Sequence, residues 1–164
     1  MNTFDAIEKR VSCRTFLKDP VPQELLKKVV DVGRRAPTAN NIQPVEFIVV
    51  TNSSILQHIA DTTDYGRFIS KAPACIVTFG RDTKYYLEDG CAAVENMLIA
   101  ATALGLGTCW VAGDKKKYCE PIRSLLDAPK DMRLIALVPI GFPAKERPPH
   151  EKRPLEEVLH WEKY

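Results

Sequence analysis

The sequence predicts an α+β sandwich in which one mixed sheet is flanked by helices. Three apolar runs have the length and composition of buried strands, at residues 46–51, 74–79 and 133–141. Amphipathic helix patterns lie between them, and the pattern at residues 89–104 is apolar around almost its whole circumference. These helix patterns vary too much for a doubly wound sheet, so the sandwich is the better prediction.

The N-terminal half predicts three helices and one polar segment that fits no regular element. Residues 3–10 form a short helix pattern. Pro22 suits the first turn of a second, amphipathic helix, which should end ahead of Pro37 because the residue before a proline avoids the helical region. A serine cap predicts a short third helix at residues 53–59. Residues 61–72 are polar and irregular.

The apolar helix at residues 89–104 organises the rest of the chain. Asp89 and Glu95 interrupt its apolar run, which is far shorter than the roughly 20 residues that a bilayer requires. A helix of this kind must be covered on several sides, so it is buried within the protein or shared between two subunits. Gly105 should end it as a left-handed C-cap, and residues 108–112 then predict a short strand.

The glycines that follow this helix do not form a dinucleotide-binding fingerprint. Gly105 and Gly107 begin such a pattern, but Trp110 holds the place of the third glycine. The fingerprint also lies between a strand and a helix, whereas these glycines follow a helix. A Rossmann-type site is therefore excluded here.

The C-terminal third adds two more helix patterns. Residues 118–126 predict an amphipathic helix, and a closing helix is expected from Pro154. The sequence shows no internal repeat, low-complexity tract or linker. A chain of 164 residues is long enough to bury about two thirds of its unfolded surface. We therefore expect a single domain over residues 1–164.

Composition argues against several classes of function. The formal charge is only +2, and residues 115–117 are the one basic block, so nucleic-acid binding has little support. The N-terminus has no apolar signal-peptide region, which predicts a cytoplasmic protein. Five cysteines without CxxC spacing predict reduced thiols, with neither a disulfide framework nor a zinc site. No histidine is placed for nucleophilic or metal chemistry; the three are His58, His150 and His160.

One candidate site follows the opening helix. In an extended segment alternate side chains share a face, so Arg10, Ser12 and Arg14 can point the same way. Two guanidiniums and a hydroxyl suit a phosphate group, because arginine binds phosphate oxygens in a bidentate manner. Solvated surface charge is the alternative interpretation, and spacing alone leaves it open. Arg153, a lone arginine in the C-terminal segment, is a distant possible partner.

Two further segments could contact a flat ligand. The loop 37–44 is bounded by prolines, and the amides of Asn41 and Gln43 can each offer a donor and an acceptor to the edge of a heterocycle. Ordinary turn chemistry is the alternative for this loop. Gly113 and the small Ala112 would allow main-chain N–H groups to approach a ligand closely. An ordinary strand end is the alternative there.

Four segments together resemble the FMN-dependent nitroreductases. RVSCRTF resembles their RRSxRxF motif, and APTANNIQP resembles their APSxxNxQPW loop. GCAAVENMLIAATALGLGTCWVAG resembles their central helix and its GLG-x-x-W exit. GFP followed by KRPLEEVL resembles their closing signature. The four matches lie in order between residues 8 and 159. The resemblance implies a three-layer α+β sandwich in an intertwined homodimer, with FMN at the subunit interface.

The same resemblance implies roles for individual residues. The phosphate and the N1/O2 edge of the flavin would be held by Arg10, Ser12 and Arg14, with Arg153 as a second phosphate arm. The partner subunit would contribute Pro37, Thr38, Ala39 and Asn41. The N5 side of the flavin would lie along Val111, Ala112 and Gly113. No metal is implied, and no side chain is expected to be catalytic, because the flavin N5 carries the hydride chemistry.

The implied function is oxidation of NADH or NADPH and reduction of nitroaromatic, quinone or similar flat acceptors by a ping-pong cycle. Two differences from the family pattern stand out, namely Val11 in place of arginine or histidine and Val45 in place of tryptophan. With the short length, they leave open an alternative, a flavin-storage or flavin-sensing protein with little turnover. A specialised reductase such as a dehalogenase is a third interpretation, but no clear lid sequence is present. Apart from a second copy, the expected partners are small molecules, with neither nucleic acid nor membrane.

Overall fold

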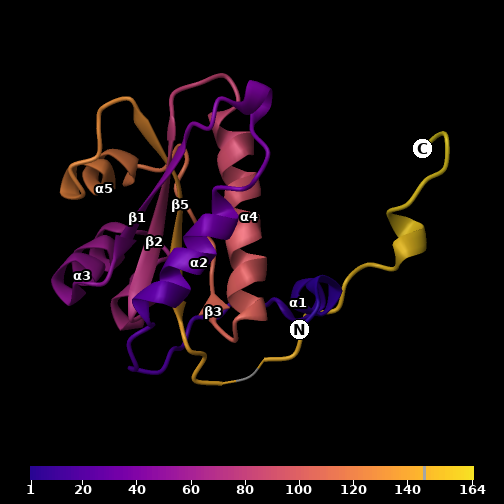
Figure 1. The fold of residues 1–164 in the computed structure, drawn as a ribbon, viewed down its shortest axis with the longest axis horizontal. Coiled ribbons are helices and arrows are strands. Elements are labelled where there is room, and N and C mark those ends of the chain that lie inside the picture. Colours follow the sequence, from indigo (N-terminus) through magenta and orange to yellow (C-terminus); the bar gives the residue numbers. More distant parts are fainter. Residues whose placement is uncertain (146) are drawn as a thin grey trace.

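A computed structural model describes residues 1–145 and 147–164. A five-stranded sheet forms the middle layer, with helices on both of its faces (Figure 1). The strand order is β1-β2-β5-β3, and β4 also pairs with β5. The strands are β1 (Val45–Val50), β2 (Ala74–Arg81), β3 (Gly107–Thr108), β4 (Val111–Ala112) and β5 (Met132–Gly141).

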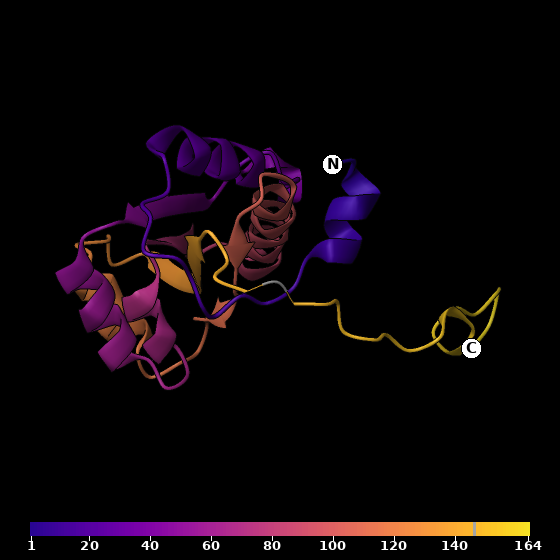
Figure 2. The same cartoon turned by 90° about the horizontal axis from the view of Figure 1, so that it is seen from below.

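Two apolar layers enclose the sheet and confirm the three-layer sandwich. Helices α3 (Ser53–Thr62) and α5 (Cys119–Leu125) cover one face, where Ile59 and Ile122 are fully buried. Helices α2 (Gln23–Gly33) and α4 (Tyr86–Ala103) cover the other face (Figures 1 and 2). Successive residues of a strand point to opposite faces, so both sides of the central strands are apolar.

The sequence predicts a mixed sheet, whereas the sheet in the structure is antiparallel. All four strand pairings are antiparallel, and the parallel element in the described residues is the isolated bridge between Ser12 and Thr108. Helix α4 does connect two strands that run in the same direction, β2 and β3. However, β5 lies between them and pairs antiparallel with each. The alternation of helices and strands in the sequence cannot reveal this insertion.

Helix α4 begins at Tyr86, three residues earlier than the sequence pattern suggests, and ends as predicted. Gly105 has φ +76°, the left-handed conformation expected of the C-cap. Its N–H donates to the carbonyl of Thr102 (3.0 Å), and the N–H of Leu106 donates to the carbonyl of Ala101 (2.8 Å). This pair of bonds is a Schellman motif, and it turns the chain directly into β3.

The predicted strand at residues 108–112 is interrupted. It forms the two short strands β3 and β4, separated by Cys109 and Trp110, and both pair with β5. The polar segment at residues 61–72 contains a short 3₁₀ helix, Arg67–Lys71. The remaining regular elements are a second 3₁₀ helix in the loop after α2, Ala39–Asn41, and the N-terminal helix α1, Thr3–Lys9, which Asn2 and Asp5 cap.

The two ends of the chain lie away from the sheet. Helix α1 packs beside α4, and the C-terminal segment extends away from the sheet (Figure 2). The helix expected from Pro154 is wrong, because only the 3₁₀ turn Leu155–Glu157 forms there. An isolated segment of this length has no packed face to stabilise a helix. Among the described helices, none is long and apolar enough to cross a membrane.

One side of α4 is incompletely covered in the single chain. A groove of about 740 Å³ runs between α1, α2 and α4. Its apolar wall includes Ile99 and Ala103 of α4, and Leu104 at the end of that helix is exposed. A helix as apolar as α4 is expected to be covered on this side as well.

Candidate functional site

The segment that carries the three candidate phosphate ligands lies along β3. Ser12 forms a parallel bridge with Thr108, and the N–H of Cys13 donates to the carbonyl of Thr108 (2.7 Å). Cys13 faces inward and is buried, and its thiol occupies the space beside Gly107. A Cβ on Gly107 would come within 2.7 Å of the Cys13 sulfur. Glycine at 107 therefore allows this segment to lie directly on the sheet.

Arg10, Ser12 and Arg14 gather around the break between β3 and β4. Burial raises the pKa of the Cys109 thiol, while the charge of Arg14, a hydrogen bond from Ser12 and the charge of Arg10 all act in the opposite direction. Each of these interactions requires proximity to the Cys109 sulfur. The three predicted residues thus all lie in the neighbourhood of Cys109, between β3 and β4, while Arg10 and Arg14 contact different elements. Two cations and a hydroxyl at this place can hold a doubly charged phosphate.

Arg14 lies above the ring of Phe68, with its guanidinium carbon 5.9 Å from the ring centroid. Phe68 belongs to the 3₁₀ helix of the segment that sequence patterns could not assign. Cation–π contact of this kind favours one orientation of the guanidinium. Arg10 instead faces α4, where its Nε lies 3.8 Å from Oε1 of Glu95.

The edge strand β4 presents Ala112 outward. The N–H of Gly113 donates to the carbonyl of Ile135 (2.9 Å), so that group is engaged within the sheet. A Cβ on Gly113 would lie 2.6 Å from the side chain of Leu134, so glycine is needed here for packing against β5. A ligand is therefore not expected to bind the Gly113 N–H. The main chain of Ala112, which is exposed, is the more suitable partner.

The loop 37–44 is built by turn chemistry and anchored to α4. Asn40, Asn41 and Gln43 all have φ between 51° and 55°, a left-handed conformation in which asparagine is common. The N–H of Ala39 donates to Oδ1 of Asp89 (3.0 Å), and Asp89 is buried at the beginning of α4. Asn41 is exposed, so its side-chain amide can reach a ligand outside the chain.

The two groups of predicted flavin ligands are held at separate places on α4. The loop is attached at Asp89, whereas Arg10 faces Glu95, about 9 Å further along the helix and about 120° around it. Figure 1 shows the loop at one end of α4 and α1 beside the other part. Within residues 1–145 and 147–164, no hydrogen bond or ion pair joins the loop to the arginine segment. One chain therefore does not assemble the predicted site.

Arg153 also lies apart from the other ligands. It is exposed on the extended C-terminal segment, where its Nε donates to Oε2 of Glu157 (3.1 Å). Figure 2 shows this segment leading away from the sheet. Within this chain, Arg153 therefore does not lie beside the other predicted phosphate ligands.

Comparison with known proteins identifies the family. A family model described as "Putative TM nitroreductase" matches residues 2–164. The chain belongs to this nitroreductase family. A protein named "Putative NADH dehydrogenase/NAD(P)H nitroreductase" from Methanothermobacter thermautotrophicus is 31% identical over 151 residues, which cover 88% of this chain and 79% of that protein.

Solved structures of nitroreductases have the same fold. A crystal structure from Bacteroides thetaiotaomicron, which bears the same name as the archaeal relative, superposes with a TM-score of 0.95 at 28% identity, covering 99% of this chain and 98% of that one. A structure named "FMN-dependent Nitroreductase" from Clostridium difficile R20291 superposes with a TM-score of 0.92 at 24% identity, covering 98% and 99%. The second likeness supports the fold.

Four residues that contact or lie beside the candidate site segments were not predicted from the sequence: Phe68, Asp89, Cys109 and Tyr118, whose hydroxyl donates to the carbonyl of Ala112. Asp89 gave a usable signal, since a carboxylate in an almost entirely apolar helix needs a buried partner. Phe68 and Tyr118 gave none, because an aromatic residue in a polar or amphipathic segment is most simply a core residue. Cys109 lay within an apolar run, where a buried thiol is the ordinary interpretation.

Proposed function

We propose that this chain is an FMN-dependent NAD(P)H oxidoreductase that reduces nitroaromatics, quinones or similar flat acceptors by a ping-pong cycle. One observation carries the proposal: Arg10, Ser12 and Arg14 all lie near Cys109, between β3 and β4, in a chain that matches a nitroreductase family from residue 2 to residue 164. The names of the relatives support both the nicotinamide substrate and the flavin.

The residues present suit FMN. Its phosphate carries nearly two negative charges, which need cationic partners to leave water. Arg10 and Arg14 supply two positive charges, and the Ser12 hydroxyl supplies a hydrogen-bond donor. At the edge of the sheet, Ala112 is exposed at the end of β4 and offers its outward main chain to a ligand. This combination fits a planar heterocycle joined to a phosphate.

The chemistry would be divided between cofactor and protein. Bound FMN supplies hydride transfer at its N5 atom. Arg14 holds a positive charge where the resemblance places the N1/O2 edge, which favours the anionic reduced flavin. Of the predicted segment 111–113, the outward main chain at Ala112 would face the N5 side. The acceptor can take its proton from water, so the proposed cycle does not require a side chain as general acid or base.

We propose that the functional particle is an intertwined homodimer. The loop 37–44 and the arginine segment are complementary but separate within one chain, so a second copy would supply Pro37, Thr38, Ala39 and Asn41 to the site. The incompletely covered side of α4 provides an apolar surface for such a partner. The C-terminal segment exposes apolar side chains that need a cover, namely Leu155, Val158, Leu159 and Trp161. An isologous dimer would bury these surfaces and bring the partner's Arg153 toward the phosphate.

Two broader features belong to the same proposal. Residues 1–164 act as one domain, and its partners are small molecules and a second copy, with neither nucleic acid nor membrane among them. All five cysteines are free, which agrees with a reducing compartment such as the cytoplasm.

The proposal is tested by titrating the purified chain with FMN and following flavin fluorescence. We expect saturable quenching with one FMN for each chain. The FMN-loaded protein should then oxidise NADH or NADPH with a quinone or a nitroaromatic, and double-reciprocal plots at several acceptor concentrations should be parallel. A chain that does not bind FMN would refute the proposal. Tight FMN binding with negligible turnover would favour the storage or sensing alternative.

A further inference from the structure

The hydrogen bonds of the β4 edge determine which peptide groups face outward. The N–H of Cys109 donates to the carbonyl of Pro139 (3.3 Å), and the N–H of Gly113 donates to the carbonyl of Ile135 (2.9 Å). In an antiparallel pair, the main-chain groups of alternate residues point toward the partner strand, and those between point away. Ala112, opposite Ala136, is one of the residues between. Its N–H and its carbonyl therefore both point away from β5.

The carbonyl on this outward edge is already occupied. The Tyr118 hydroxyl donates a hydrogen bond to the carbonyl of Ala112, and the thiol of the next residue, Cys119, donates to the carbonyl of Gly113. Both donors lie at the beginning of α5, immediately after the turn that follows β4. What remains for a ligand beside Ala112 is a donor, its N–H group.

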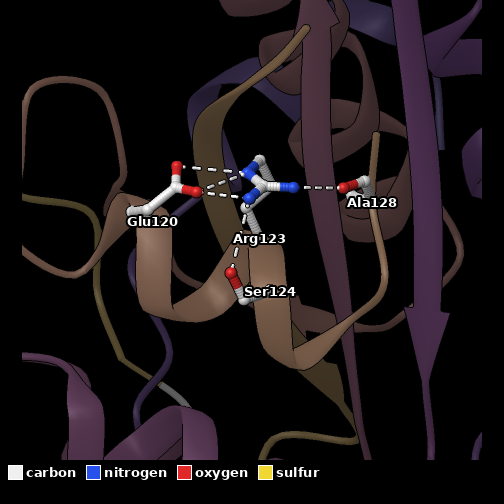
Figure 3. A network of polar contacts seen from close by, with 4 residues as sticks. All are labelled: Glu120, Arg123, Ser124 and Ala128. Atoms are coloured by element: carbon white, nitrogen blue, oxygen red, sulfur yellow. Dashed lines mark hydrogen bonds and ion pairs between the residues drawn. The ribbon is translucent and has the colours of Figure 1, made fainter. Parts of the chain in front are cut away.

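Tyr118 is held rigidly enough to act in this way. Its side chain is 5% exposed and belongs to the same apolar cluster as Val111 and Ile122. Helix α5 is itself fixed by Arg123, which donates to the carbonyl of Ala128 (2.6 Å) and to the carboxylate of Glu120 (Figure 3). Burial and the nearby charge of Asp64 raise the pKa of Tyr118, so its hydroxyl remains a donor at neutral pH.

We propose that Tyr118 is a positioning residue of the flavin site: by holding the carbonyl of Ala112, its hydroxyl fixes the 112–113 peptide and with it the backbone at Ala112, so that the N–H of the preceding 111–112 peptide is presented to an acceptor atom of the bound heterocycle. This inference rests on the proposed function. In this proposal, Tyr118, which lies outside the family motifs, orients the outward N–H donor on β4, that of Ala112. Without the hydroxyl, the carbonyl of Ala112 loses its donor, and the two peptides that meet at the Ala112 Cα lose their fixed orientation.

The test compares Tyr118→Phe with wild type, and Tyr65→Phe serves as the control because Tyr65 is 89% exposed. We expect Tyr118→Phe to raise the Kd for FMN about tenfold, the range expected for one hydrogen bond. The visible absorption bands of the bound flavin should shift as well, which a merely structural change would not cause. Tyr65→Phe should match wild type in both measurements.

Two results would overturn the inference. One is an unchanged Kd and an unchanged flavin spectrum in Tyr118→Phe, and the other is a loss of binding that only parallels a loss of folded protein. Because the variant could fail to fold, wild-type amide exchange is measured too: FMN should slow exchange at Ala112, and an unaffected Ala112 amide contradicts the inference. Failure of wild type to bind FMN would contradict the proposed function, and this inference with it.

Discussion

The arginines of the candidate phosphate site differ in how their charges are compensated. Arg10 faces the carboxylate of Glu95 at 3.8 Å, and this pair is partly exposed. Arg14 contacts the ring of Phe68, which orients the guanidinium but carries no opposing charge. The positive charge of Arg14 is therefore less neutralised than that of Arg10, and it is more available to an anionic ligand. Its loss should affect FMN more than the loss of Arg10.

Substitution Arg14→Ala should weaken FMN binding by about 1.5–3 kcal/mol, the range for a hydrogen bond to a charged group. Fluorescence titration gives the Kd. Arg81→Ala is a matched control, because the Arg81 side chain pairs with Glu46 and Asp131 and contacts none of Arg10, Ser12 and Arg14. An Arg14→Ala protein with the wild-type Kd would remove this residue from the site.

Tyr86 gives a prediction for alkaline pH. The hydrogen bond that its hydroxyl donates to Asp114 (2.7 Å), together with burial, raises the pKa of Tyr86 to about 12. In the unfolded chain the pKa is about 10, so the folded state retains a proton that the unfolded state loses. This stabilisation is complete below pH 10 and is lost as pH rises toward 12. Tyr86→Phe should lose less stability than wild type between pH 9.5 and 11.5, as measured by urea unfolding. The reason is that in wild type the folded state binds up to about one proton more than the unfolded state in this range. Parallel losses in the two proteins would contradict the assignment.

At the scale of elements, α4 connects most of the molecule. Its first turn holds the loop 37–44 through Asp89, its middle faces Arg10, and its C-terminal cap directs the chain into β3. The cap matters because β3 and β4 follow it within a few residues. A change in the path at Gly105 would therefore be transmitted to the edge on which the proposed flavin lies.

Gly105→Ala should reduce the free energy of unfolding by about 1 kcal/mol. Gly105 has φ +76°, which costs a residue with a Cβ about 1–2 kcal/mol, and nothing within 4 Å would clash with that Cβ. Gly105→Asn, which tolerates this conformation better, should lose less. Urea unfolding of the three proteins measures the order. An alanine variant as stable as wild type would show that this cap does not carry the strain that its dihedral angle implies.

How much the sequence predicts depends on whether a feature is local. The strands β1, β2 and β5 and the cap at Gly105 follow from runs and turns of neighbouring residues, and they are confirmed. The antiparallel order and the break at Cys109 depend on where β5 inserts, which local patterns do not encode. The nearness of Arg10, Ser12 and Arg14 to Cys109 follows from one extended segment beside β3, but alternation does not reveal that Arg10 contacts Glu95 whereas Arg14 contacts Phe68. The contacts of Phe68, Asp89 and Tyr118 arise from packing between distant elements.

At the scale of the whole molecule, the unusual feature is that a single chain leaves large apolar surfaces uncovered. Helix α1 exposes Phe4 at its surface, the C-terminal segment exposes Trp161, and a large groove lies beside α4. The predicted flavin ligands are also divided between separate places on α4. A second copy related by two-fold symmetry would account for both observations at once, since it would cover the apolar surfaces and supply the loop that each site lacks.

The most direct test of this account is complementation between two defective chains. Arg14→Ala and Asn41→Ala damage different halves of the proposed site, so neither homodimer should bind FMN normally. When the two chains are co-expressed with different tags, each mixed dimer should contain one site with both changes and one intact site. Random pairing then predicts wild-type affinity at about a quarter of all sites in an FMN titration, and at half of the sites in the purified mixed dimer. Mixed particles that show no wild-type site would contradict a flavin site shared between two subunits.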